Sequence, residues 1–124
     1  MSVAVLRHGD YLIASIQSDL SDSQVLALRD DLAQRVGRER IRGIVVDVSA
    51  LDVMDSFVAR SLRSIALTTN LRGVQTVLVG IQPDVAIAVV QFNLDLYPLR
   101  AVLDLDEAVA LLDRITGEES ADGG

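Results

Sequence analysis

The segment between Asp47 and Phe57 carries the side chains with the clearest chemical potential in this sequence. It reads Asp-Val-Ser-Ala-Leu-Asp-Val-Met-Asp-Ser-Phe and continues an apolar run, 43–46, that is typical of a buried strand. Ser56 stands where the next helix is expected to begin. Free backbone N–H groups and the positive end of a helix macrodipole suit a phosphate group at such a position. The pattern indicates that Ser56 is the candidate switch of a regulatory protein.

Asp55 and Ser56 also fit a simpler structural role, because both residue types are preferred helix N-caps worth about 1 kcal/mol. Capping and phosphorylation therefore both stay open. A phosphate on Ser56 would add about −1.5 to −2 charges. The helix terminus would accept that charge, whereas Asp52 and Asp55 would repel it. Such a modification would change the local surface potential without unfolding the domain, and a docked partner would respond to it.

An enzymatic alternative uses an acidic pocket built from Asp47, Asp52 and Asp55, with Asp84 or Asp104. Carboxylates at strand ends can bind a hard cation such as Mg²⁺, which would suit a metal-dependent phosphotransfer domain. Receiver-type transfer to aspartate normally also uses a lysine, and the sequence contains none. Serine hydrolase chemistry is excluded because Ser56 lacks the flanking glycines of a nucleophile elbow.

Composition limits the partners of the chain. The 124 residues predict one domain, and the net charge of −7 argues against nucleic acid. The absence of cysteine excludes disulfides and thiolate metal sites. No signal peptide and no apolar run near 20 residues is visible, so we expect a cytoplasmic protein without a membrane partner. We expect no cofactor. Half of the residues are apolar, which fits either a filled core or an oligomeric surface.

Apolar periodicity and turn signals predict nine elements. Strands are expected at 3–6, 11–16, 43–48, 74–79 and 101–103, and helices at 21–37, 55–73, 83–92 and 104–115. This β-β-α-β-α-β-α-β-α order predicts an α/β fold, a mixed sheet with an initial hairpin and parallel later strands. The loops 49–55 and 80–83 should then meet at one sheet edge, where such folds place their sites. Residues 1–116 are expected to form the domain and 117–124 a flexible tail.

Three motifs resemble a known family. Residues 51–60, Leu-Asp-Val-Met-Asp-Ser-Phe-Val-Ala-Arg, look like the phosphorylation segment of STAS-domain proteins. Residues 77–86, Val-Leu-Val-Gly-Ile-Gln-Pro-Asp-Val-Ala, strengthen the match. Together with Leu-Ile-Ala-Ser-Ile-Gln at 12–17, they resemble the small stressosome scaffold proteins of the RsbS type. The likeness covers about residues 3–115.

The resemblance implies a non-catalytic scaffold and phospho-switch in a partner-switching stress response that regulates a sigma factor. Such scaffolds co-assemble in the cytoplasm with larger, sensor-bearing STAS proteins and hold a serine switch kinase. The kinase phosphorylates the scaffold, leaves it and activates the next regulator, and a phosphatase resets the scaffold. By this resemblance Ser56 is the phosphoacceptor and Asp55 its acidic neighbour. Val79 stands where many relatives have threonine, which argues against a second phosphosite there.

We expect the partner-binding residues to come from the two longer motifs, and we expect no sensor domain before the first strand. The expected partner-binding residues are Asp52, Asp55, Ser56, Phe57, Gly80, Gln82 and Pro83. A close alternative is a monomeric anti-anti-sigma factor, which would share the fold and the serine but bind an anti-sigma kinase. The sequence does not distinguish these two roles.

Overall fold

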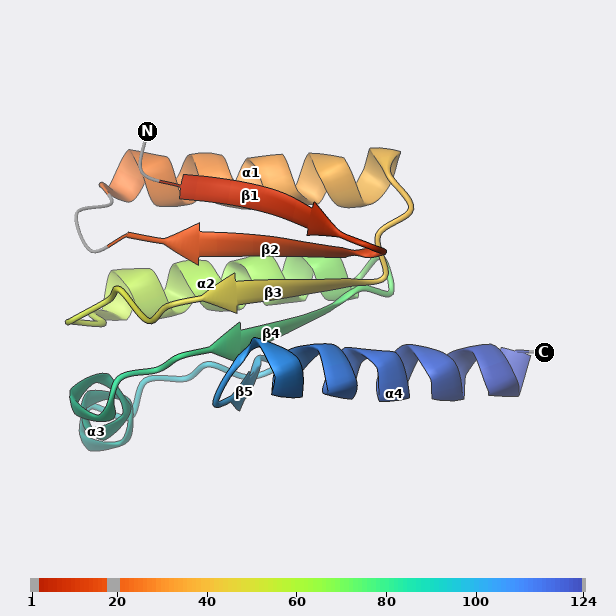
Figure 1. Cartoon of the computed structure of the whole chain (residues 1–124). Coiled ribbons are helices and arrows are strands. Elements are labelled where there is room, and N and C mark those ends of the chain that lie inside the picture. Colours follow the sequence, from red (N-terminus) through yellow and green to blue (C-terminus); the bar gives the residue numbers. More distant parts are fainter. Residues whose placement is uncertain (1–2, 18–20, 124) are drawn as a thin grey trace.

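One mixed five-stranded sheet forms the centre of the computed structural model, which describes residues 3–17 and 21–123 (Figure 1). The strands lie in sequence order across the sheet: β1 (Val3–His8), β2 (Tyr11–Ile16), β3 (Gly43–Asp47), β4 (Gln75–Val79) and β5 (Arg100–Val102). β1 and β2 pair as an antiparallel hairpin, and β2 to β5 run parallel. The predicted fold class and the predicted order of elements are both confirmed.

Helices cover both faces of this sheet, and one helix lies at its end (Figure 1). α1 (Asp22–Arg38) and α2 (Ser56–Asn70) pack on one face, and α4 (Leu105–Gly123) packs on the other. α3 (Pro83–Gln91) lies beyond the carboxyl ends of the parallel strands. Because α2 follows β3 and α3 follows β4, both helices begin at this carboxyl edge.

Two apolar clusters hold the helices to the sheet, and strand alternation explains why there are two. In β3, Ile44 and Val46 belong to the cluster under α1 and α2, whereas Val45 belongs to the cluster under α4. The largest fully buried side chains are Leu12, Ile16, Leu32, Ile44, Leu62, Ile65, Leu78 and Leu112. Each such side chain contributes about 1.5–3 kcal/mol by leaving water. The first cluster includes Ala59 and Leu62 near the start of α2 and so holds that end of the helix to the sheet.

A hydrogen bond fastens α4 to the hairpin. The Tyr11 hydroxyl donates to Oδ1 of Asp113 on α4, and the Tyr11 ring is itself buried. Burial, and then this hydrogen bond to Asp113, raise the pKa of the Tyr11 phenol above its usual value. The phenol therefore stays protonated as the donor at neutral pH.

The ends of α1, α2 and α4 differ from the sequence prediction, and α3 ends one residue earlier than predicted. Gly37 was expected to stop α1, but the helix includes it and ends at Arg38, because a helical glycine costs about 1 kcal/mol and does not break the helix. α2 ends at Asn70, before Gly73. α4 continues to Gly123, so the segment predicted as a tail from Gly117 is helical; its flexibility stays a prediction.

None of the helices in the described part of the chain is long and apolar enough to cross a bilayer.

Candidate functional site

Two loops meet at the carboxyl edge of the sheet, as the sequence predicted. The backbone N–H of Val48 donates to Val79 O at 3.0 Å, which continues the pairing of β3 with β4 beyond the strands. Gln82 then spans the two loops, because its Nε2 donates to Ser49 O at 2.7 Å and to Asp52 Oδ1 at 3.3 Å. The segments 49–55 and 80–83 therefore form one continuous surface.

Gly80 makes this close approach possible. Its φ of +77° lies in the left-handed region, which residues other than glycine rarely adopt. A Cβ at this position would stand 2.8 Å from the Ser49 Cβ and 3.3 Å from the Asp47 Oδ1. Both the backbone conformation and the available space therefore require glycine, which gives Gly80 a structural role beside the predicted partner contact.

The start of α2 resolves which residue caps the helix. Asp55 is the N-cap, and its Oδ1 accepts a hydrogen bond from the Val58 N–H at 2.8 Å. Ser56 is the first residue of the helix and its side chain is exposed. Within the described residues, the Ser56 hydroxyl has no hydrogen-bond partner. The capping role therefore belongs to Asp55, and no described residue engages the Ser56 hydroxyl in a hydrogen bond.

Replacement of Asp55 by alanine is expected to lower the free energy of unfolding by about 1 kcal/mol, because the Val58 N–H loses its acceptor. Asp55→Asn is the matched control, since asparagine caps about as well as aspartate. Urea unfolding of both variants checks this expectation. Equal stability of Asp55→Ala and the native protein would contradict the capping role.

The acidic pocket predicted for a metal is not assembled. Each carboxylate binds a local donor instead: Asp47 accepts from the Ser49 N–H at 2.9 Å, Asp52 accepts from Gln82 and Asp55 accepts from the Val58 N–H. Among the described residues, no group of three histidine or acidic side chains could hold a metal ion. The prediction of a metal-dependent site from these aspartates is therefore wrong, because neighbouring carboxylates in the sequence point to different backbone and side-chain donors.

The predicted partner-binding residues differ in their accessibility. Asp52, Asp55, Ser56 and Pro83 are exposed, whereas Phe57, Gly80 and Gln82 are half-buried. Gln82 precedes α3 as its N-cap residue, and Pro83 occupies the first turn. A partner at this edge would therefore meet two acidic side chains, one free hydroxyl and the start of α3.

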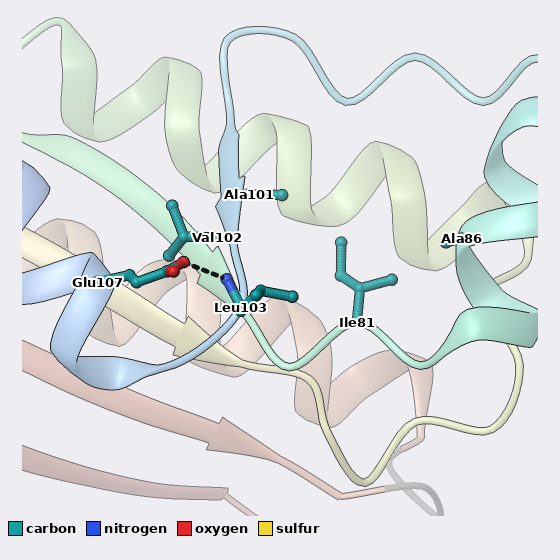
Figure 2. Close-up of a pocket in the computed structure, with 6 residues that line it drawn as sticks. All are labelled: Ile81, Ala86, Ala101, Val102, Leu103 and Glu107. Carbon is teal, nitrogen blue, oxygen red and sulfur yellow. Dashed lines mark hydrogen bonds between the residues drawn. The ribbon is translucent and has the colours of Figure 1, made fainter.

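An apolar surface beside this edge was missed by the sequence reasoning. A hollow of about 400 Å³ is lined by Ile81, Ala86, Ala101, Val102, Leu103 and Glu107, and Figure 2 shows how these side chains lie. A second hollow on α3 includes Ile87 and Val90, two residues that are 60% and 81% exposed. The available signal was the composition of α3, which is apolar on all sides although only Val85 is buried. Exposed apolar patches of this kind mark contact surfaces.

The STAS domain family matches residues 2–109, and this chain belongs to that family. The structure is similar to a serine-to-glutamate variant of RsbS from Moorella thermoacetica, with a TM-score of 0.79 and 33% identity over 92% of this chain and 97% of that one. It is also similar to a chain in the solved architecture of the stressosome, with a TM-score of 0.77 and 34% identity over 91% of this chain and 98% of that one. The chain thus has an RsbS-like structure.

The curated relatives are mostly longer proteins. The RsbT co-antagonist protein RsbRB of Bacillus subtilis is 25% identical over 91 residues, which cover 73% of this chain and 33% of that protein. Across the four curated relatives that match, the chain spans between 33% and 62% of their length. The chain therefore shares the STAS region of these relatives.

Proposed function

We propose that this chain is a non-catalytic stressosome scaffold and phospho-switch that acts in the cytoplasm. It binds a serine switch kinase at the carboxyl edge of its sheet and releases the kinase when Ser56 is phosphorylated; a phosphatase resets Ser56. The observation that carries the proposal is the exposed Ser56 hydroxyl at the first residue of α2, directly after the loop 49–55 that Gln82 joins to the loop 80–83, in a chain with an RsbS-like structure.

The electrostatics of the edge support a switch at this position. Asp52 and Asp55 already make the surface around Ser56 acidic, and both are exposed. A phosphate would add about −1.5 to −2 charges next to Asp55 and on the same edge of the sheet as Asp52. At physiological ionic strength the added potential falls off over about 8 Å. A partner that loses affinity must therefore contact the edge itself, which agrees with the assignment of Asp52, Asp55, Ser56, Phe57, Gly80, Gln82 and Pro83 as partner-binding residues.

The relatives support the identity of the partners. Proteins named RsbT co-antagonists share the STAS region with this chain and extend well beyond it. We infer that such a longer, sensor-bearing STAS protein is the co-scaffold. The exposed apolar side chains of α3 provide a surface that an assembly could bury.

Light scattering coupled to size-exclusion chromatography tests the scaffold role. The protein alone, and mixed with a sensor-bearing STAS partner, is measured before and after addition of the switch kinase. A particle of many subunits that retains the kinase is expected. A persistent monomer that binds an anti-sigma kinase, even with the STAS partner present, would contradict the scaffold and favour the anti-anti-sigma alternative.

A further inference from the structure

Arg60 lies on the same face of α2 as Ser56. It follows Ser56 by four residues on α2, and residues at this spacing are neighbours on one helix face, with Cβ atoms about 5–6 Å apart. Both side chains are exposed. Among the residues that the structure describes, Arg60 makes no ion pair and no hydrogen bond. An uncommitted guanidinium thus lies within reach of the hydroxyl.

The surrounding charges leave Arg60 as the cation best placed to meet a phosphate on Ser56. Asp55 precedes the serine and is acidic. Arg63 lies about one turn after Arg60 on α2 and already has partners. Its Nε donates to Tyr97 O at 2.9 Å and lies 3.6 Å from Asp95 Oδ2. Arg60 therefore differs from Arg63 in being free to bind a new anion.

We propose that Arg60 binds the phosphate of phosphorylated Ser56 through an ion pair along α2, an inference that rests on the proposed role of Ser56. The orientation is favourable, because an acidic group four residues before a basic one complements the helix dipole. The planar guanidinium also matches phosphate oxygens with two parallel hydrogen bonds. Phosphorylation then changes the surface in two ways. It adds negative charge, and it holds the exposed Arg60 side chain in an ion pair, so that Arg60 can no longer contact the partner.

The test uses the full chain with phosphoserine incorporated at position 56 during translation, so that no kinase is needed. The pH midpoint of the second phosphate ionisation is followed by ³¹P NMR in the parent and in Arg60→Gln, Arg60→Lys and Arg38→Gln. Arg38 is the matched control, because it is also an exposed helical arginine but lies at the end of α1, before β3 begins.

Arg60→Gln is expected to raise the midpoint by about 0.3 pH units, because a cation at this spacing stabilises the dianion. Arg60→Lys should keep at least half of that shift, Arg38→Gln should leave the midpoint unchanged, and 1 M NaCl should abolish the difference. Equal midpoints in the parent and Arg60→Gln would overturn the proposal. That outcome would leave the phospho-switch intact, whereas failure of an added kinase to modify Ser56 would overturn the switch and not the ion pair.

Discussion

Replacement of Ser56 by alanine is expected to abolish phosphorylation by the switch kinase while the variant still binds that kinase. The substitution removes the acceptor hydroxyl and no hydrogen bond within the described structure. Because Asp55 caps α2, the free energy of unfolding should change by less than about 0.5 kcal/mol. Intact-protein mass spectrometry measures the modification, and calorimetric titration with the kinase measures the binding.

Ser49→Ala is the matched control for this experiment, since Ser49 is an exposed serine on the same edge and contributes only its backbone oxygen to Gln82. It should be phosphorylated like the native protein. Ser56→Asp should bind the kinase more weakly, although one formal charge imitates a phosphate only in part. Modification of Ser56→Ala at the stoichiometry of the native protein would refute the assignment of the phosphoacceptor.

Replacement of Gly80 by alanine is expected to lower the free energy of unfolding by about 3 kcal/mol. The left-handed backbone contributes about 1–2 kcal/mol of this, and the clash of the new Cβ with Ser49 adds a further 1–3 kcal/mol. Because the clash pushes the loop 49–55 away from the loop 80–83, kinase binding should weaken even at temperatures where the variant is fully folded. Chemical unfolding and titration with the kinase report the two effects separately.

Gly73 offers a matched control for Gly80, because its φ of +78° is nearly the same but no atom lies within 4 Å of a Cβ built there. Gly73→Ala should therefore show the backbone effect alone, about 1–2 kcal/mol, with normal kinase binding. If the two substitutions destabilised the protein equally, the close contact between the two loops would not be a feature of the protein in solution.

The elements of the fold were predictable because their signals are local. The apolar run before Asp47 and the helical spacing after Ser56 each depend on a few neighbouring residues, and the structure places a strand and a helix there. The meeting of the loops followed from parallel pairing alone. The start of α2 was likewise predictable, since a polar pair after a strand and a short loop is a typical helix beginning.

The cap was not predictable, because Asp55 and Ser56 are both good N-cap residues. The choice depends on the backbone: Asp55 has the extended conformation of a cap, with φ −89° and ψ 176°, and Ser56 is already helical. The hydrogen-bond donor that each aspartate binds was also not predictable from the sequence. Asp47 and Asp52 are close in the chain, yet one binds the Ser49 N–H and the other binds Gln82 on a different loop.

The exposure of α3 depends on contacts between distant segments. The sequence predicted a helix here but not its exposure, because the helix lies at the end of the sheet, where Val85 is its one buried residue. Val90 and Phe92 remain 81% and 69% exposed, because no other described element packs over them. Sequence periodicity reports which residues are apolar, and only the packing shows which of them stay uncovered.

The most direct test of the switch follows two quantities in one reaction of the native protein with its kinase and ATP. Phosphopeptide mass spectrometry measures the phosphate on Ser56, and fluorescence anisotropy of a labelled kinase measures the fraction still bound. The account predicts one phosphate per chain, located on Ser56, with the kinase leaving in proportion to its appearance. A kinase that stays bound to fully phosphorylated protein, or that leaves while Ser56 is unmodified, would contradict it.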